Sequence, residues 1–180
     1  MGKVYDAIDD KLGAWITRQR MFFVGTAPTD GGHVNVSPKG PIETLRILDG
    51  NTVAYLDLVG SGAETIAHLR DNGRIVIMVC AFEGGPRIVR LHVSGEILYG
   101  DAIEIPQVDV LPVQQRTVIR VEIDRIADSC GYGVPLMTYV GERSQSRAWA
   151  ERKLAKSPRA IEDYKDEKNA LSIDGLPALR

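Results

Sequence analysis

Two long segments of the chain alternate apolar and polar side chains with the period of a β-strand. Residues 87–99 place Val89, Leu91 and Val93 at every second position, with polar side chains between them. Residues 117–127 alternate in the same way. Alternation over this length is typical of antiparallel strands that have one buried face and one solvated face. The chain is therefore expected to be mainly β, and an all-helical fold is excluded.

Shorter segments rich in β-branched and aromatic residues predict further strands. The first two of them flank residues 28–32, a turn whose two glycines suit a hairpin. These segments are 21–27, 33–37, 42–48, 52–58 and 74–81. The whole pattern predicts about six strands, with only two helices before residue 140. That proportion favours an antiparallel β-barrel with flanking helices.

Apolar residues recur at steps of three and four from Val4 to Ile16, which predicts an amphipathic N-terminal helix that ends near Arg20, with Leu12 and Ile16 on its buried face. A second helix is expected to begin at Ser61. Ser61 as the N-cap and Glu64 three positions later have the spacing of a capping box. This helix is expected to end at residues 72–73, where a glycine favours termination.

The composition changes after residue 141. Residues 142–168 are charged, of mixed sign and interrupted by Ser157 and Pro158. They predict two short helices, with Pro158 in the first turn of the second, where a missing N–H costs little. A length of 180 residues matches one hydrophobic core. We therefore interpret the chain as a single domain, 1–180, with a helical C-terminal extension over residues 142–180.

Charge and composition exclude several classes of protein. The formal net charge is -2 at pH 7, so the chain has no basic footprint for nucleic acid and no polybasic anchor for a membrane surface. No apolar stretch approaches the roughly 20 residues of a membrane span. The two cysteines, Cys80 and Cys130, are far apart, and no signal peptide precedes them, which favours a reducing, cytoplasmic location.

The three histidines carry no metal-binding pattern. His33, His68 and His92 are separated from one another and from the cysteines, so no metal site is expected. His68 lies in the predicted second helix and is interpreted as a solvated surface residue. His92 is expected on the polar face of its strand.

Two local features could bind an anion. Lys39 lies in the segment 36–40 at the end of a strand, where its ammonium group and the nearby Ser37 hydroxyl could meet a phosphate. The turn 57–65 leads from a strand into a helix, and its free N–H groups, glycines and hydroxyls could cradle a phosphate. Each feature has an ordinary alternative, a turn lysine in water in the first case and a simple capped helix in the second.

The order of these features resembles the pyridoxamine 5′-phosphate oxidase-like family. The matching pieces are residues 36–39 (VSPK), 55–57 (YLD), 60–62 (GSG) and 72–76 (NGRIV). Residues 128–135 (DSCGYGVP) and 167–177 (EKNALSIDGLP) are similar to an uncharacterised branch of that family. The resemblance implies a split β-barrel of Greek-key type that binds FMN between the two subunits of a homodimer.

The resemblance also implies a set of cofactor-binding residues. Those expected around the phosphate are Lys39, Ser61, Gly62 and Thr65. Those expected along the ribityl chain and the ring edge are Asn35, Ser37, Tyr55 and Asp57. Tyr132 of the second subunit is expected near the substrate, because glycines on both sides of an aromatic residue let the backbone approach a flat ligand. No catalytic acid or base is identified.

The chain also departs from true pyridoxamine phosphate oxidases. Val34 stands where those enzymes carry an arginine, and Gly62 and Ala63 stand where they carry Arg-Lys. The C-terminal residues 176–180 do not reproduce their basic, histidine-containing substrate motif. We therefore expect an FMN-binding oxidoreductase that moves hydride between the flavin and another small substrate. The alternatives are a deazaflavin-binding protein, a haem-binding protein with His92 as axial ligand, and a non-enzymatic flavin-binding protein.

Overall fold

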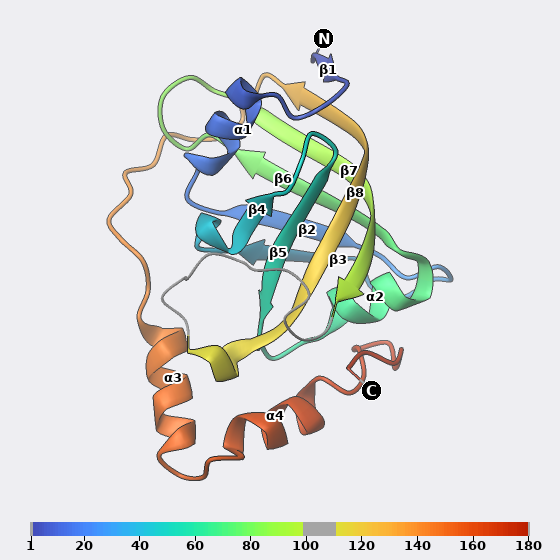
Figure 1. The fold of residues 1–180 in the computed structure, drawn as a ribbon, viewed down its shortest axis with the longest axis vertical. Coiled ribbons are helices and arrows are strands. Elements are labelled where there is room, and N and C mark those ends of the chain that lie inside the picture. The colour runs from blue at the N-terminus through green and yellow to red at the C-terminus, as the bar shows by residue number, and fades with distance from the viewer. Residues whose placement is uncertain (1, 99–110, 180) are drawn as a thin grey trace.

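The computed structural model describes residues 2–98 and 111–179, and its centre is one antiparallel sheet (Figure 1). The strand order is β3-β2-β6-β7-β8-β5-β4, and β1 pairs with β8 off this path. The strands are β1 (Val4–Tyr5), β2 (Phe22–Thr26), β3 (Asn35–Lys39), β4 (Leu45–Ile47), β5 (Thr52–Leu58), β6 (Arg74–Cys80), β7 (Ile88–Leu98) and β8 (Gln115–Ser129). The helices are α1 (Asp10–Thr17), α2 (Glu64–Asn72), α3 (Gln145–Leu154) and α4 (Ala160–Lys168).

The sheet curls into a half-barrel, which confirms the predicted split β-barrel with flanking helices. The curl depends on β8, which is long enough to pair with β1, β5 and β7. The register between β7 and β8 shifts between His92 and Val93, and such a bulge bends and twists a strand. The predicted alternation of residues 87–99 is confirmed up to Leu98, and Tyr99 lies outside the described residues.

Apolar side chains from every layer meet inside the curl. Phe22 of β2 and Tyr55 of β5 pack edge to face, with ring centroids 5.4 Å apart. Leu12 and Ile16 of α1 join the same core and are almost fully buried. The predicted buried face of the first helix is therefore confirmed.

The start of the chain differs from the prediction. The first helix begins at Asp10 and not near Val4, because the Asp9 carboxylate accepts a hydrogen bond from the Leu12 N–H (2.7 Å) and caps the helix there. Val4 lies in β1 and pairs with Ala127 of β8. Its apolar spacing matched a helix, but the pairing with a long neighbouring strand determines the local structure.

Two further elements differ in their boundaries. The predicted capping box of Ser61 and Glu64 is not formed. Helix α2 begins at Glu64, after Ala63, and has no side-chain cap. The expected strand over residues 42–48 is a 3-10 turn, Ile42–Thr44, followed by the short β4. Residue 73 ends α2 in the left-handed conformation, as predicted.

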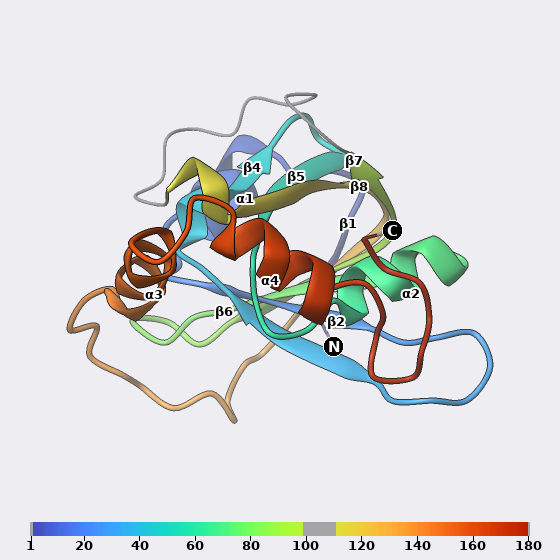
Figure 2. The same ribbon diagram turned by 90° about the horizontal axis from the view of Figure 1, so that it is seen from below.

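The C-terminal helices pack on each other below the barrel (Figure 2). Trp149 of α3 and Tyr164 of α4 stack edge to face at 5.0 Å, and the Lys153 ammonium lies over both rings. The two predicted helices are confirmed, although Pro158 precedes α4, which begins at Ala160. None of the helices in the described part of the chain is long and apolar enough to cross a membrane.

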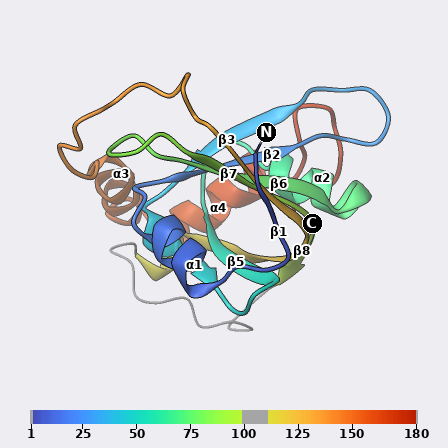
Figure 3. The same ribbon diagram turned by 90° about the horizontal axis from the view of Figure 1, so that it is seen from above.

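The tail that follows α4 returns to the barrel. Figures 2 and 3 show its loop beside the hairpin of β2 and β3. There the His33 ring and the Asp174 carboxylate lie 2.7 Å apart, and Asp174 also accepts a hydrogen bond from the His33 N–H. Ala178 is fully buried in the main core, and its carbonyl accepts a hydrogen bond from Arg70 of α2. The tail thus connects the hairpin to α2.

Candidate functional site

Three of the predicted site residues share one face of the edge strand β3. Asn35, Ser37 and Lys39 lie opposite Thr26, Val24 and Phe22 of β2, whose side chains point into the barrel. Neighbours across an antiparallel pair point to the same side of the sheet. The three polar side chains therefore form a half-buried row along the open edge of the barrel.

The upper half of this row is a hydrogen-bonded network. The Asn35 amide donates to the hydroxyl of Thr26 (3.0 Å) and to that of Thr65 in α2 (3.1 Å). The Ser37 hydroxyl donates to the Asn35 side-chain oxygen (2.8 Å). These contacts bring Asn35, Ser37 and Thr65 together and fix α2 against the hairpin.

His68 extends the network into the interior, and its expected solvated position is wrong. Its side chain is fully buried, and its Nδ1 lies 2.9 Å from the Thr26 hydroxyl. No described group reaches its Nε2. Burial lowers the pKa of His68, against the opposing charges of Glu64, Asp174 and Asp71. The histidine faces inward because α2 packs against β2 and β7, which buries that side of the helix.

The lower half of the row is a buried cluster of charges. The Lys39 ammonium lies 2.9 Å from one oxygen of the fully buried Asp57 carboxylate. Two nitrogens of the Arg116 guanidinium lie 2.7 and 2.6 Å from the other oxygen. The third donates to the Gly62 carbonyl (2.8 Å). The cluster therefore connects the ends of β3, β5 and β8 to the turn that precedes α2.

Arg116 was not identified from the sequence. One signal pointed to it indirectly, since a carboxylate inside the apolar strand β5 needs a cationic partner when it is buried. The sequence did not show which cation that would be. Arg116 directly precedes the alternating segment 117–127, and only the pairing of β5 with β8 brings it to Asp57.

The turn before α2 already contains a carboxylate. The Glu64 side chain folds back onto Gly62, where a Cβ would collide with it. Glu64 also accepts a hydrogen bond from the Ile173 N–H (3.3 Å), and the Asn169 amide donates to the Gly60 carbonyl (3.0 Å). The place where the turn was expected to hold a phosphate is therefore occupied by the protein's own side chain and bridged by the tail. Exposed Ser61 lies in the same turn.

Two predicted residues lie away from this group. The Tyr55 side chain is fully buried in the core, its hydroxyl has no partner among the described residues, and burial raises its pKa well above 10. Tyr132 is 82% exposed in the segment after β8. The other seven predicted residues lie along the edge of the barrel, from Asn35 to the turn at Ser61.

A groove opens where the row ends at Lys39. Its volume is about 580 Å³, and it separates the ends of β3 and β5 from the segment that leads into α3. Four cationic side chains line it, with one carboxylate, Glu142, among its described lining residues. The cations are Arg20, Lys39, Arg143 and Arg147.

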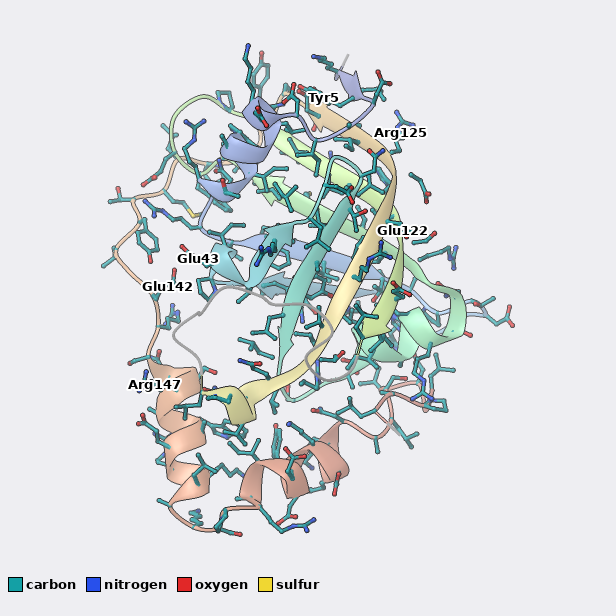
Figure 4. The ribbon with its side chains drawn as sticks, viewed as in Figure 1. Tyr5, Glu43, Glu122, Arg125, Glu142 and Arg147 are labelled. Carbon is teal, nitrogen blue, oxygen red and sulfur yellow. The ribbon has the colours of Figure 1, made fainter. Side chains whose placement is uncertain are left out.

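A second hollow of about 840 Å³ adjoins the groove. The two share Arg20, Pro41, Tyr139 and Glu142 as a common wall. The Tyr139 hydroxyl donates to Glu142 (2.7 Å), which raises the pKa of Tyr139, and the Arg20 guanidinium lies 4.3 Å from the centre of its ring. Figure 4 shows Glu43, Glu142 and Arg147 along one side of the molecule, from the second hollow to the start of α3. Within the described ranges, no three His, Cys, Asp or Glu side chains gather closely enough to hold a metal ion.

Comparison with known proteins identifies the family, although no family model matches the chain. The chain is 37% identical to the pyridoxamine 5′-phosphate oxidase family protein ustO of Aspergillus flavus, over 97% of its own length and 77% of that protein. It belongs to the pyridoxamine 5′-phosphate oxidase family. The family resemblance predicted from the sequence motifs is thereby confirmed.

Solved structures support the same fold. The FAD binding protein from Mycobacterium smegmatis aligns with a TM-score of 0.50 at 10% identity, over 71% of this chain and 96% of that protein. A conserved hypothetical protein from Mycobacterium tuberculosis aligns with a TM-score of 0.50 at 15% identity, over 76% and 96%. These matches end well short of the whole chain, so this family member carries substantial structure beyond the shared barrel.

Proposed function

We propose that this protein binds a flavin, FMN, along the edge of the barrel and acts as an oxidoreductase on a small substrate. The observation that carries the proposal is the position of Lys39, which lies at the junction of the polar row on β3 and the basic groove. Membership of the pyridoxamine 5′-phosphate oxidase family supports it. So does the described FAD binding of the neighbour from Mycobacterium smegmatis.

The chemistry of the groove fits a ligand with one anionic end and a flat apolar body. Lys39 uses one of its three N–H donors on Asp57 and keeps others for a ligand. Apolar side chains share the groove with the cations and include Met21, Pro38 and Leu58. We prefer FMN to FAD because the resemblance to the pyridoxamine 5′-phosphate oxidase-like family implies FMN.

A bound flavin would supply the hydride and electron transfer. In this proposal the protein binds and orients it. Lys39 contacts the anionic end, while the Asn35 amide and the Ser37 hydroxyl provide hydrogen bonds along the row. Gly62, Ser61 and Thr65 close its inner side. The adjoining hollow, with Tyr139 and Glu142 in the shared wall, is the place we propose for the substrate.

We also propose a homodimer, in which Tyr132 of one subunit lies near the site of the other. The edge strand β3 exposes Val36, which is 67% exposed, and Val34 before it is 73% exposed. The segment after β8 exposes Leu136 and Val140. Apolar surface of this kind favours association, and a two-fold interface would complete two equivalent sites. Light scattering coupled to size-exclusion chromatography tests this, and a monomer at micromolar concentration would contradict it.

The other candidates are kept as outcomes of the same experiment. A deazaflavin would use the same groove, and haem would require an axial ligand such as His92, which is exposed on β7. A non-enzymatic flavin-binding protein would take up FMN without turnover. The thiols of Cys80 and Cys130 are free, which agrees with the cytoplasmic location that we propose.

The test is a titration of the purified protein with FMN, FAD, a deazaflavin and haem, followed by absorbance and fluorescence. We expect FMN to bind with micromolar affinity or better. Lys39→Ala should weaken FMN at least about tenfold, because it removes a charge-assisted hydrogen bond. Lys11→Ala on the exposed side of α1 is the matched control and should bind as the wild type does. A protein that binds none of the four ligands would overturn the proposal.

A further inference from the structure

A chain of hydrogen bonds runs from the interior of the barrel to its open edge. It begins at the ring of His68 in α2, whose Nδ1 lies 2.9 Å from the hydroxyl of Thr26. The Asn35 amide donates to this hydroxyl (3.0 Å), and the Ser37 hydroxyl donates to the Asn35 side-chain oxygen (2.8 Å). His68 and Thr26 are buried, whereas Asn35 and Ser37 are half-buried on the row where we place the ligand. The buried histidine is therefore linked to residues that would meet the ligand.

The hydroxyl of Thr26 sets the direction of this chain. Its oxygen accepts an N–H of Asn35, and it has one proton of its own to donate. Among the described residues, the only other group within reach of this hydroxyl is Nδ1 of His68. The Thr26 proton therefore has an acceptor only when Nδ1 is bare, which places the single proton of the neutral ring on Nε2. Burial lowers the pKa of His68 below 6.5, so the ring is neutral at neutral pH.

This direction determines what Asn35 and Ser37 offer to a ligand. The two N–H groups of Asn35 donate to the hydroxyls of Thr26 and Thr65, and its oxygen accepts the Ser37 proton. The side-chain donors of Asn35 and Ser37 are thus all used within the protein. Lone pairs of the Ser37 oxygen and of the Asn35 oxygen remain. The two side chains therefore present acceptors, and no donor, at the open edge.

The opposite arrangement needs only a half-turn of the Asn35 amide. Its oxygen would then accept the protons of Thr26 and Thr65, and its nitrogen would donate to Ser37, whose proton would turn outward. In that arrangement Thr26 keeps no proton for His68, and Nδ1 has to be the donor. The proton position on His68 and the role of Ser37 are therefore coupled: a bare Nδ1 goes with an accepting Ser37, as in the structure, and a protonated Nδ1 with a donating Ser37.

We propose that His68 is a positioning residue that acts through Thr26 and Asn35 to make Ser37 a hydrogen-bond acceptor toward the ligand. The ligand group beside Ser37 is then a donor, either a hydroxyl or an N–H. This inference rests on the proposed function for the identity of the ligand as a flavin. A flavin carries both kinds of donor, hydroxyls on its ribityl chain and an N–H on its ring, and the experiment distinguishes them.

Two variants of His68 separate its hydrogen bond from its packing. His68→Leu leaves the buried protons of Thr26 and Thr65 without an acceptor, so the Asn35 amide should turn and Ser37 should become a donor. We expect this variant to bind riboflavin, which is FMN without its phosphate, about tenfold more weakly. His68→Asn supplies an oxygen in place of Nδ1 and should restore the affinity. A packing role alone predicts the reverse order, because leucine suits an apolar interior better than asparagine does.

The control is His92→Leu, at an exposed position of β7, which should bind riboflavin as the wild type does. Circular dichroism checks that each variant is folded. Nitrogen-15 NMR of the histidine rings in the flavin-free protein reads the position of the proton directly, and His68→Leu identifies the signals of His68. We expect the proton on Nε2 at neutral pH. A proton on Nδ1 would overturn the inference, whatever the flavin affinities are.

A second ligand, lumiflavin, has the flavin ring without the ribityl hydroxyls. If His68→Leu weakens riboflavin alone, the donor beside Ser37 is a ribityl hydroxyl, and if it weakens both ligands, the donor is the ring N–H. If His68→Leu binds both as His92→Leu does, or if His68→Asn binds no better than His68→Leu, the positioning role is overturned. If the wild type binds no flavin, the proposed function fails, and the NMR measurement still decides whether His68 holds Ser37 as an acceptor.

Discussion

Asp57 and Arg116 form an ion pair beneath the candidate site, in which two guanidinium nitrogens converge on one carboxylate oxygen at 2.7 and 2.6 Å. The Asp57 side chain is fully buried, and that of Arg116 is 3% exposed. A buried ion pair of this kind adds little stability compared with apolar residues in its place. Removal of one partner is nevertheless strongly destabilising, because it leaves the other charge buried and unpaired. The pair therefore matters most as a fixed support for Lys39 and for the Gly62 turn.

Removal of Arg116 should be costly. We expect Arg116→Met to lower the free energy of unfolding by about 3 kcal/mol, because Asp57 keeps only the Lys39 ammonium as a buried counter-charge. Arg120→Met on the same strand is the matched control. Arg120 is 30% exposed and pairs with Glu96 and Glu122 at the surface, so its loss should cost less than about 1 kcal/mol. Urea unfolding measures the free energy of unfolding of both variants. Equal losses of stability would show that the buried pair contributes no more than the surface pairs of Arg120.

His68 should make the protein sensitive to mild acid. Burial lowers the pKa of His68 in the folded state, against the carboxylates of Glu64, Asp174 and Asp71. The unfolded chain therefore takes up this proton first as the pH falls below about 6.5, and the folded state is progressively disfavoured. The effect of one such group is at most about 1.4 kcal/mol for each pH unit.

The measurement is urea unfolding of the wild type and of His68→Leu on both sides of this pH. We expect the variant to lose less stability on acidification, because leucine has no proton to take up. His92→Leu, at an exposed position of β7, should keep the acid response of the wild type. An unchanged acid response in His68→Leu would mean that other groups produce it.

Gly131 should tolerate no side chain. Its φ of +67° lies in the left-handed region, and a Cβ there would lie 2.7 Å from the Arg87 backbone nitrogen. We expect Gly131→Ala to destabilise the fold by at least about 2 kcal/mol, from the backbone conformation and the collision together. Gly133→Ala has open space and should change stability by less than about 0.5 kcal/mol. Similar thermal midpoints for the two variants would contradict the assignment of a structural role to Gly131.

The sheet was largely predictable because its signal is local. The alternation of residues 87–99 and 117–127 follows from one buried face, and strand β5 has the predicted bounds Thr52–Leu58. The strand conformation of Val4 could not be predicted from the local sequence. Its apolar spacing fits a helix, and only the length of β8 shows that a strand can pair there. Ser61 likewise is of a residue type that is common at an N-cap, yet the first residue of α2 is Glu64, three positions later.

For the site as well, the residues within one strand could be predicted from the sequence, whereas their neighbours from other elements could not. Lys39 and its row on β3 follow from motif and alternation, because both lie within one strand. The other cations at this edge did not follow from the sequence, since Arg116 and Arg143 reach it from β8 and from the segment before α3. The direction of His68 was also set by packing, because a helix with one histidine among apolar residues does not show which side its partners cover.

The tail should detach from the hairpin in acid before the barrel unfolds. Hydrogen bonds from the His33 backbone N–H, and then from its ring, lower the pKa of Asp174 below 3.8. A carboxylate with a lowered pKa stabilises the folded state at every pH above its unfolded value of about 3.9, and this contribution is lost as the pH falls through the folded value. Hydrogen exchange of residues 169–179 reports the change, because Ser172, Ala178 and Leu179 donate backbone hydrogen bonds within the tail. Asp174→Asn should show faster exchange already at neutral pH, whereas Asp163→Asn on the exposed side of α4 should not. If the Asp174→Asn tail stays as protected as the wild type, then the buried Ala178 and its bond to Arg70 hold the tail without the His33 contact.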